Sequence, residues 1–414
     1  MKISHCLAVL LVACGGDKEP SEDPCDASGT ICTWAGVPQT QRVGLDGIQA
    51  TSSELNLPQD VTFGPDGTAY VPDFNNHRIR RIDPEGIITT ISGTGFLGDG
   101  PEGASNVFAW NHPTNVAVDP DDPNVVHIAA WHNSRLNTID VSSSNTRFAC
   151  GTGGRDYDGE GEDALSAVLD LPSSIAFDSM GNLYISDQAN QAIRRVLPDD
   201  TIELIAGSPG LPMAGAWNSD PTLPVEDHIE DATAGYGGDG GPAIDALLFA
   251  EIGQQADPSS KLTIVDDVLY LADSGNNIIR KIDLDTMVIE LVAGVPWHRN
   301  GIDLPVAADP TAGDGGDALD AYLNNPRDVA VGIDGEVYIA DTDNHCVRVV
   351  YADGIIETFA GLCGSEPQPG DAFVGEASAA EDARLYSPYG IATDGDGNVY
   401  ISDTKNQVIR RVAY

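Results

Sequence analysis

Residues 57–93 read LPQDVTFGPDGTAYVPDFNNHRIRRIDPEGIITTISG and contain four short runs in which apolar and polar residues alternate. The runs are separated by PDG, FNNH and PEG, and Gly, Pro and Asn at such places mark turns. The stretch therefore predicts four antiparallel strands, which we name a to d in chain order. One sheet of this size cannot bury its own faces, so it needs neighbours.

The same pattern returns along the chain, and its recurrence decides the fold. Close copies begin at Leu171 (LPSSIAFDSMGNLYISDQANQAIRRVLPDDTIELIAG), Asn325 (NPRDVAVGIDGEVYIADTDNHCVRVVYADGIIETFAG) and Ser387 (SPYGIATDGDGNVYISDTKNQVIRRV), and diverged copies begin at His112 and Pro258. Every copy carries a proline at its start: Pro58, Pro113, Pro172, Pro258, Pro326 and Pro388.

The unit P-x-x-V-A-x-D-x-x-G-x-V-Y-I-A-D-x-x-N-H-x-I-R-R resembles the NHL repeat, and the resemblance covers nearly all of residues 30–414. It implies an all-β fold, a six-bladed β-propeller whose sheets pack radially around a central channel. Because strands alternate in direction, the b–c turns and the connections from strand d to the next strand a emerge on one face. We call it the loop face.

The last copy supplies only strands a, b and c, since the chain stops at Tyr414. Residues 30–36, TICTWAG, suit a strand and end in the Ala-Gly that closes the d strands at residues 206–207 and 360–361. We expect this segment to be the missing fourth strand. The two ends of the chain would then share the sixth blade, and neither would leave an open sheet edge.

Strand b ends in Asp in five copies, and Arg follows seven residues later on strand c. The pairs are Asp73 and Arg80, Asp187 and Arg194, Asp273 and Arg280, Asp341 and Arg348, and Asp403 and Arg410. The second copy has Ala130 and Asn137 there, so acid and base are lost together. We expect each pair to lie directly across the b–c hairpin as an ion pair.

Repetition favours a structural role for these pairs, because a catalytic site needs different groups in different roles. Such a strut contributes about 0 to 1 kcal/mol when exposed and more when buried. The Asn three residues after the Asp position recurs in all six copies, and we expect it at φ > 0.

Glycine-rich segments with an acid join strand d to the next copy: GLDG (44–47), GDG (98–100), DGEG (158–161), GGDGG (237–241), GDGG (313–316) and GDAFVGE (370–376). We expect the acid to cap the short helical turn that follows. Calcium binding is the alternative, since oxygen-rich loops suit this ion. Insertions at residues 208–236 and after Pro296 enlarge the same face. The candidate binding residues there are Trp217, His228, Trp297, His298, His112, Asp239 and Asp314.

Two classes of function fit this pattern. The first is a binding scaffold for a protein or glycan, because loops on a rigid framework are where binding usually resides. The second follows from the resemblance: peptidyl-hydroxyglycine amidating lyases and gluconolactonase-type hydrolases share this plan and use metals in or above the channel. His112, His228 and His298 are the histidines that could meet there. No Walker loop, CxxC or serine nucleophile elbow is present.

The chain has 64 acidic and 21 basic side chains, a formal net charge of −43. Such a charge repels phosphate backbones, which argues against a nucleic-acid partner. We expect a soluble monomer apart from any lipid anchor.

The first residues, MKISHCLAVLLVACGGD, resemble a bacterial lipoprotein signal that ends in a lipobox. The resemblance implies cleavage after residue 13, acylation of Cys14, and a location in the bacterial cell envelope. Residues 14–29 are polar and rich in Gly and Pro, as flexible tethers are.

An exported chain would form disulfides. Cys346 and Cys363 flank strands c and d of the fifth copy, and Cys25 and Cys32 flank the start of the closing strand, so these pairings are favoured. Other pairings among the four cysteines stay open. Cys150 replaces a small residue in a d strand and is expected in the core.

Overall fold

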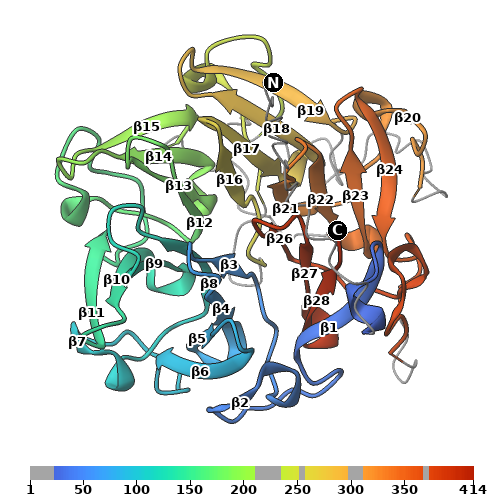
Figure 1. Ribbon diagram of the computed structural model, residues 1–414. Helices are drawn as coiled ribbons and strands as arrows, with labels where there is room; N and C mark the ends of the chain where they lie inside the picture. The colour runs from blue at the N-terminus through green and yellow to red at the C-terminus, as the bar shows by residue number, and fades with distance from the viewer. Residues whose placement is uncertain (1–22, 210–234, 251–256, 297–310, 367–372) are drawn as a thin grey trace, which may run out of the picture.

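The computed structural model describes residues 23–209, 235–250, 257–296, 311–366 and 373–414. These residues form six antiparallel sheets arranged as blades around one axis (Figure 1). The all-β fold and the six-bladed propeller are therefore confirmed. The a strands surround the axis and the d strands lie at the rim.

The first three blades follow one another in sequence. Blade one contains β3 (Thr62–Phe63), β4 (Ala69–Asp73), β5 (Arg78–Ile82) and β6 (Ile87–Ser92), with β2 (Ile48–Gln49) outside. Blade two contains β8 (Pro113–Val118), β9 (Val125–Ala130), β10 (Arg135–Asp140) and β11 (Asn145–Cys150), with β7 (Gly103–Ala104) outside. Blade three contains β12 (Pro172–Phe177), β13 (Leu183–Asp187), β14 (Ala192–Val196) and β15 (Ile202–Gly207).

The other blades complete the ring. Blade four contains β16 (Leu262–Val265), β17 (Val268–Asp273), β18 (Ile278–Asp283) and β19 (Val288–Ala293). Blade five contains β21 (Pro326–Val331), β22 (Val337–Asp341), β23 (Cys346–Val350) and β24 (Ile355–Ala360), with β20 (Gly316–Asp317) outside. Blade six contains β26 (Gly390–Thr393), β27 (Val399–Asp403), β28 (Val408–Val412) and β1 (Thr30–Gly36), with β25 (Ser378–Ala379) outside.

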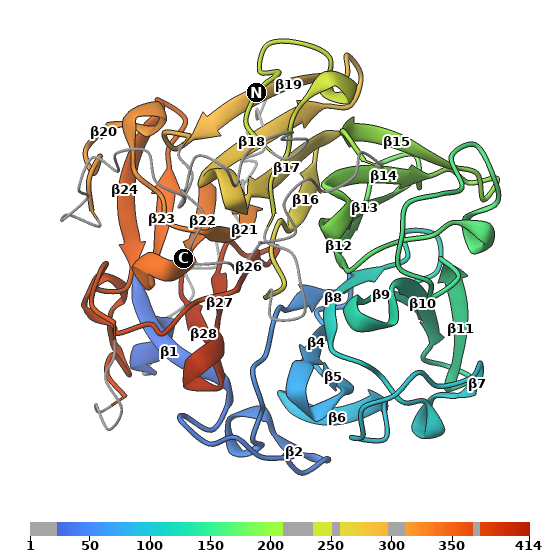
Figure 2. The ribbon, with the colours of Figure 1, turned by 180° about the vertical axis from the view of Figure 1, so that it is seen from behind.

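The N-terminal strand closes the ring as the sequence predicted. β1 pairs antiparallel with β28, and Ile31 stands opposite Val412 while Gly36 stands opposite Val408. Figures 1 and 2 show β1, in blue, beside the red strands of the chain's other end from both sides. Sequence reasoning did not foresee the short fifth strands β2, β7, β20 and β25, which cover rim edges that would otherwise stay unpaired.

The helical elements in the described residues are all short 3-10 turns. One set forms the b–c turns: η3 (Phe74–Asn76), η5 (Trp131–Asn133), η7 (Gln188–Asn190), η10 (Ser274–Asn276), η12 (Thr342–Asn344) and η14 (Thr404–Asn406). A second set precedes the a strands: η2 (Ala50–Ser52), η4 (Ser105–Val107), η6 (Ala164–Ser166), η9 (Ala243–Asp245), η11 (Ala318–Asp320) and η13 (Ala380–Asp382). The turn η1 (Pro24–Asp26) precedes β1. In the described ranges, no helix has the length and apolar character to cross a membrane.

The apolar core lies between blades and not within them. Each of the six blade interfaces has its own cluster of buried side chains, and the cluster between blades six and one joins Ala35, Tyr400 and Ile409 to Val71 and Ile82. A blade buries its faces only against two neighbours, so the stability of the ring depends on its being closed.

Polar ties on the loop face also join neighbouring blades. The residue after each b–c turn has positive φ. In four of the six blades its side chain accepts a hydrogen bond from the backbone of the next blade. The carbonyl oxygen of Gln407 accepts from the Leu57 N–H at 2.7 Å, that of Asn277 from Asn325 at 2.7 Å, and His345 Nδ1 accepts from Ser387 at 3.1 Å. The Gln407 tie joins the last blade to the first.

Candidate functional site

The repeated arginines are buried, and each has a second partner that sequence reasoning missed. In blade four, Arg280 lies 3.3 Å from the Asp273 carboxylate and 2.8 Å from the carboxylate of Asp239, which belongs to the glycine-rich connection. Its guanidinium also donates to the backbone carbonyls of Leu247 and Gly237, at 2.8 and 2.9 Å. One fully buried cation thus ties strands b and c to the segment that leads into the blade.

The other blades vary this arrangement. Arg80 lies 3.2 Å from Asp73 and 3.1 Å from Asp46, and Arg194 lies 3.7 Å from Asp187 and 2.7 Å from Glu160. Arg348 lies 3.8 Å from Asp341 and also pairs with Asp314. Arg410 lies 3.6 Å from Asp403 and donates to the Gly375 carbonyl. In four blades the acid of the glycine-rich connection is therefore bound to the repeated arginine, and in blade two Asp99 of the connection lies 3.4 Å from Arg135.

Two expectations about the hairpin were wrong in detail. Asp73 stands opposite Arg78, and Arg80 stands opposite Val71, so the ion pair is diagonal and is bridged by the length of the arginine side chain. The recurring Asn does not occupy the left-handed region; the residue after it does, as at His77 with φ 50°. Asn76 Nδ2 instead donates to the Asp73 carboxylate, which explains why this Asn recurs.

The acids of the glycine-rich connections do not cap the turns that follow. Asp163 and Asp317 occupy those cap positions, where their side chains accept from the Leu165 and Leu319 N–H groups. Asp239 and Asp314, predicted as binding-face residues, pair with Arg280 and Arg348, and their role in binding stays a prediction. Their negative charge is thus already compensated by arginine.

Burial raises the pKa of the Asp side chains at the ends of the b strands. Desolvation raises the pKa of Asp187 and Asp341 to about 7 and that of Asp273 and Asp403 to about 6, while the adjacent arginines oppose this rise. The carboxylate of Asp273 also accepts from the Phe249 N–H at 2.9 Å and from Asn276 at 2.9 Å. Such networks are structural struts whose members depend on one another.

Blade two lacks the repeated Asp–Arg pair and carries aromatic rings in the segment that precedes it. Its strut positions hold Ala130 and Asn137, and the segment before β8 carries Phe108 and Trp110, where other blades have Ala or Ser and Leu. Both rings are buried with their centroids 4.5 Å apart, and they share a cluster with Ala130. Larger apolar groups therefore accompany the loss of the two charged side chains. Replacing a buried ion pair with apolar groups often costs little or no stability.

Replacing Asn137 with leucine should stabilise the protein by about 1 to 2 kcal/mol, because a buried amide without partners is costly. Asn137 is fully buried, and neither its Oδ1 nor its Nδ2 has a hydrogen-bond partner among the described residues. Denaturant unfolding measures the change. The matched control is Asn133→Leu, since Asn133 accepts from the Asn111 N–H and donates to the Gly98 carbonyl, and this variant should lose stability. A destabilised Asn137→Leu variant would contradict the prediction.

Three histidines gather on the loop face between blades one and two. His112 precedes β8, His132 lies in η5, and His77 follows η3. The Nδ1 atoms of His112 and His132 are 2.9 Å apart, and the His77 and His112 rings meet edge to face at 4.7 Å. Burial lowers the pKa of all three, that of His112 to about 4. Sequence reasoning singled out His112 but not His132.

The channel is crossed by a buried polar network that sequence reasoning also missed. Lys261 of blade four lies 3.2 Å from Asp60 of blade one and 3.3 Å from Asp328 of blade five. Its ammonium donates to the Gln59 carbonyl at 2.6 Å, and Asn115 donates to Asp60 at 2.6 Å. Blades one and four stand on opposite sides of the ring, so these contacts span the axis. The side chains of Lys261, Asp60 and Asp328 are at most 7% exposed.

The network continues toward the loop face. Arg327 stacks over the Tyr389 ring at 4.0 Å and lies 3.1 Å from the Asp257 carboxylate. That carboxylate also accepts from the Tyr389 hydroxyl at 2.9 Å. In the sequence, the network is indicated only by the residue that stands before the first apolar residue of strand a. This residue is acidic in PQDV and PRDV and basic in PSSKL.

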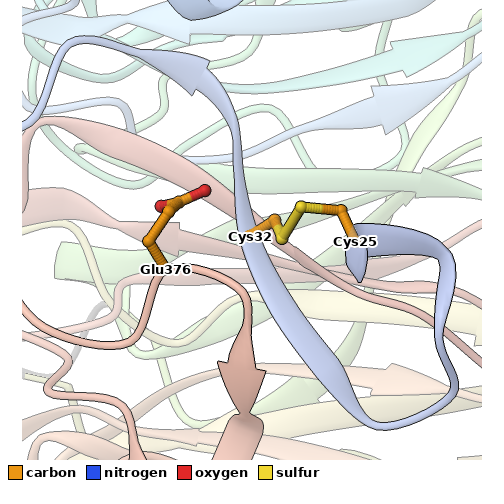
Figure 3. Close-up of side chains that lie close together, drawn as sticks. All are labelled: Cys25, Cys32 and Glu376. Atoms are coloured by element: carbon orange, nitrogen blue, oxygen red, sulfur yellow. A yellow bond between two sulfur atoms is a disulfide. The ribbon is translucent and has the colours of Figure 1, made fainter. Parts of the chain in front are cut away.

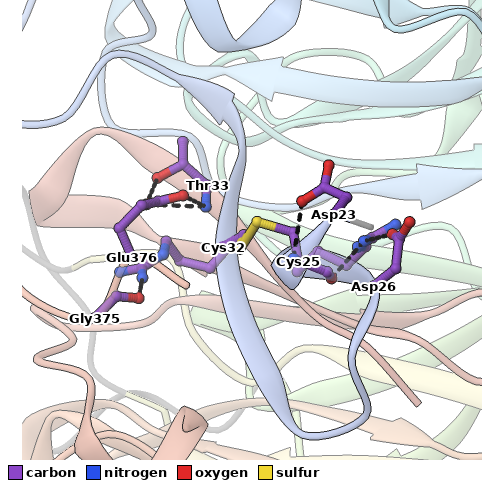
Figure 4. Close-up of a disulfide and its surroundings, with 9 residues drawn as sticks. Asp23, Cys25, Asp26, Cys32, Thr33, Gly375 and Glu376 are labelled. Carbon is purple, nitrogen blue, oxygen red and sulfur yellow. Dashed lines mark hydrogen bonds and ion pairs between the residues drawn. A yellow bond between two sulfur atoms is a disulfide. The ribbon is translucent and has the colours of Figure 1, made fainter. Parts of the chain in front are cut away.

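The N-terminal residues form a clasp around β1. Cys25 and Cys32 are joined by a disulfide, and Glu376 lies on the other side of β1 (Figure 3). Figure 4 shows that the Glu376 carboxylate accepts from the Thr33 N–H and hydroxyl, at 3.0 and 2.8 Å. Arg411 of β28 pairs with Asp26 at 2.6 Å. The clasp thus reinforces the pairing of β1 with β28.

A cleft of about 280 Å³ adjoins the clasp where blade six meets blade one, and its lining includes Trp34, Gln49 and Arg411. In the described part of the chain, one group of three or more Cys, His, Asp or Glu ligand atoms lies within 4.8 Å, and it is Cys25, Cys32 and Glu376. The disulfide and the Thr33 hydrogen bonds already engage all three.

Reduction of the disulfides should lower stability by about 2 to 3 kcal/mol for each bridge, by the loop-entropy model. The second bridge joins Cys346 and Cys363. Cys150 is a buried free thiol, and burial raises its pKa to about 12. Urea unfolding with and without a phosphine reductant measures the difference for a chain that starts at residue 23. The double variant Cys25→Ser, Cys363→Ser should match the reduced protein. An unchanged midpoint would contradict the expected contribution.

Several predicted residues lie outside the described ranges: Cys14, Trp217, His228, Trp297 and His298. The structure therefore brings together His112, His77 and His132, and the predicted meeting of His112 with His228 and His298 stays a prediction. Asp239 and Asp314 belong to the struts of adjacent blades.

Comparison with known proteins identifies similar chains. Teneurin-4 of Homo sapiens is 28% identical over 388 residues, which cover 87% of this chain and 12% of that protein. Teneurin-1 of Gallus gallus is 26% identical over 386 residues, which cover 88% of this chain and 13% of that protein. The chain thus spans about an eighth of the length of these relatives.

Solved structures share the fold. A protein of unknown function from Bacteroides thetaiotaomicron has a TM-score of 0.58 at 19% identity, covering 92% of this chain and 75% of that one. An auxiliary nutrient binding protein from Bacteroides ovatus has a TM-score of 0.59 at 15% identity, covering 92% and 76%. The teneurin NHL domain family matches residues 36–300 and 289–369, which include most of the blades described above. This chain therefore belongs to the teneurin NHL domain family.

Proposed function

We propose that this propeller is a binding scaffold that takes a protein or glycan ligand on its loop face. The observation that carries the proposal is the polar network across the channel. Lys261, Asp60 and Asp328 cross the axis with paired, buried groups, which favours recognition of a ligand on a face of the ring. The Bacteroides ovatus neighbour, described as an auxiliary nutrient binding protein, is a precedent for binding by this fold.

The loop face is the better of the two faces for this role. It carries the b–c turns, the three imidazoles and the connections between blades, and in the described residues struts and side-chain ties hold several of these segments. Rigidly positioned loops bind with little loss of conformational entropy. The opposite face carries short turns built from Asp and Gly, as at Asp66 and Gly67.

Masking one face at a time tests the proposal. Asn75 is exposed on a b–c turn and Asp199 is exposed on a c–d turn of the opposite face. A polyethylene glycol chain is attached to Asn75→Cys or to Asp199→Cys, in a chain that starts at residue 23. Both proteins are then applied to an array of bacterial and host glycans and to purified envelope proteins. Binding that is blocked at position 75 and kept at position 199 supports the loop face, and the reverse pattern contradicts it.

A metal-dependent lyase or lactonase is the second candidate, because His112 lies on the same face with two further imidazoles. Turnover of a lactone or a peptidyl-hydroxyglycine that requires added zinc, and that is lost in His112→Asn, would overturn the scaffold proposal. Calcium that raises the melting temperature without any turnover would leave it intact.

We also propose that the chain is exported to a bacterial cell envelope and anchored through acylated Cys14, with residues 14–29 as the tether. The support is the lipobox pattern Leu11-Val12-Ala13-Cys14. Cys14→Ser should move the protein from the membrane to the soluble fraction of cells that express the full chain. Unchanged membrane association in fractionated cells would reject the anchor while leaving the fold and the binding face untouched.

A further inference from the structure

The cluster of His77, His112 and His132 departs from the repeated design of the propeller. The side chain at the position of His77 ties blades together in four of the other five blades, as Gln407, Asn277 and His345 do, while Ser134 of blade two has no partner among the described residues. His77 Nδ1 has no hydrogen-bond partner among the described residues although the atom is buried. Its ring instead faces the edge of His112. Between blades one and two, the side-chain hydrogen bond is thus absent, and the His77 and His112 rings are in contact instead.

Two polar atoms lie within hydrogen-bond distance of His112 Nδ1. His112 Nδ1 lies 2.9 Å from His132 Nδ1 and 2.9 Å from Asn111 Oδ1. A neutral imidazole carries one proton on two nitrogens, and an amide oxygen is only an acceptor. One proton at His112 Nδ1 can serve only one of these two neighbours fully. A metal ion would use all three atoms as lone-pair donors, with each ring proton on Nε2.

The spacing of the nitrogens selects the kind of metal. An ion about 2.0 Å from both Nδ1 atoms would see them at roughly 90°, the angle between neighbouring ligands in square-planar coordination. A tetrahedral ion such as zinc would need the two nitrogens roughly 3.3 to 3.4 Å apart at similar bond lengths. Imidazole nitrogen suits copper and nickel, and copper(II) binds most tightly of the first-row divalent ions.

We propose that His112 and His132, with Asn111, form a copper(II) site on the loop face. The inference goes beyond the binding function proposed above, since neither a protein nor a glycan ligand requires it. His77 is the nearest further imidazole, and its ring centroid is 4.7 Å from that of His112. Water would complete the coordination of an ion at this partly exposed place.

The surroundings hold the rings and admit a cation. Trp131 stacks on His132 with centroids 4.2 Å apart, and Phe74 contacts His112 at 4.5 Å. Arg155 is the cation near His132, and its charge is paired with Asp170 at 2.5 Å. The net charge of −43 raises the local concentration of cations around the whole chain.

Electron paramagnetic resonance of the full chain loaded with one equivalent of copper(II) glycinate tests the site. We expect a square-planar copper signal with splitting from two imidazole nitrogens, which stays after gel filtration. Zinc should bind at least tenfold more weakly in isothermal titration. The double variant His112→Asn, His132→Gln should lose the signal, and asparagine suits the positive φ of 59° at position 112. A melting temperature close to that of the parent shows that the variant is folded.

The matched control is His127→Gln, which removes a histidine of the same blade that is bound to Asp119 at 3.0 Å. It should keep both the copper signal and its nitrogen splitting. A signal that survives in the folded double variant would place the copper elsewhere and overturn the proposal, as would copper that leaves the parent protein on gel filtration. Loss of glycan or protein binding in these variants is a separate readout, so the two proposals can fail independently.

Discussion

Arg280→Leu is expected to lower the free energy of unfolding by about 3 to 5 kcal/mol, because removal of one partner leaves buried charges uncompensated. The guanidinium is fully buried and serves Asp273, Asp239 and the Leu247 and Gly237 carbonyls. All of these acceptors would lose the guanidinium as a donor at once, and Asp273 would keep only its neutral donors Phe249 N–H and Asn276. Urea denaturation followed by fluorescence measures the change, and the slope shows whether the transition stays cooperative.

The neighbouring residue provides a matched control. Lys281 lies next along β18, and its pair with Glu290 is 3.2 Å long, with side chains 39% and 55% exposed. Lys281→Leu should change stability by less than about 0.5 kcal/mol, because exposed pairs contribute little. Arg280→Lys keeps the charge but loses the planar guanidinium. Its loss of stability should lie between those of Arg280→Leu and Lys281→Leu. Equal effects of Arg280→Leu and Lys281→Leu would show that the strut is not a stabilising element.

The fold could be predicted because the sequence features that indicate it recur from copy to copy. Six prolines, six b–c asparagines and five Asp–Arg pairs recur in register, and one misread copy would not have changed the conclusion. The closing strand was also predictable, since TICTWAG matches the d strands and the last copy lacks one. Repetition thus carries information about strand order that a single blade does not contain.

The candidate site was harder to predict for the same reason. Lys261, Asp60 and Asp328 each stand directly before the first apolar residue of strand a in their copies, but the residue type there changes from copy to copy. Only closure of the ring brings them together across the axis. His132 has no counterpart in the other copies, so comparing the blades could not assign it a role. The acids of the glycine-rich connections looked like caps or calcium ligands because the arginine that binds them follows 34 to 41 residues later in sequence.

The closed ring explains why the chain needs both of its ends. Ile31 and Ala35 of β1 are fully buried, and they join the clusters that blade six forms with blades five and one. Thr33 of β1 also donates hydrogen bonds to the Glu376 carboxylate, and β1 places Gly36 against the blade-six turn. A Cβ at Gly36 would lie 2.4 Å from the Gln407 carbonyl oxygen, so this strand end has room only for glycine.

A chain that starts at residue 38 should therefore lose the cooperative unfolding transition of the whole domain. Without β1, the edges of β28 and β25 are unpaired, and both apolar interfaces of blade six open to water. This loss is comparable with the total stability of an ordinary domain, about 5 to 15 kcal/mol. Calorimetry measures the transition, and a chain that starts at residue 23 is the control, since it keeps the clasp and β1. A synthetic peptide of residues 23–37 should restore the transition when added to the shortened chain, because the same backbone pairs with β28 are re-formed. A shortened chain that melts at the temperature of the control would show that the five complete blades carry the fold and that ring closure by β1 contributes little.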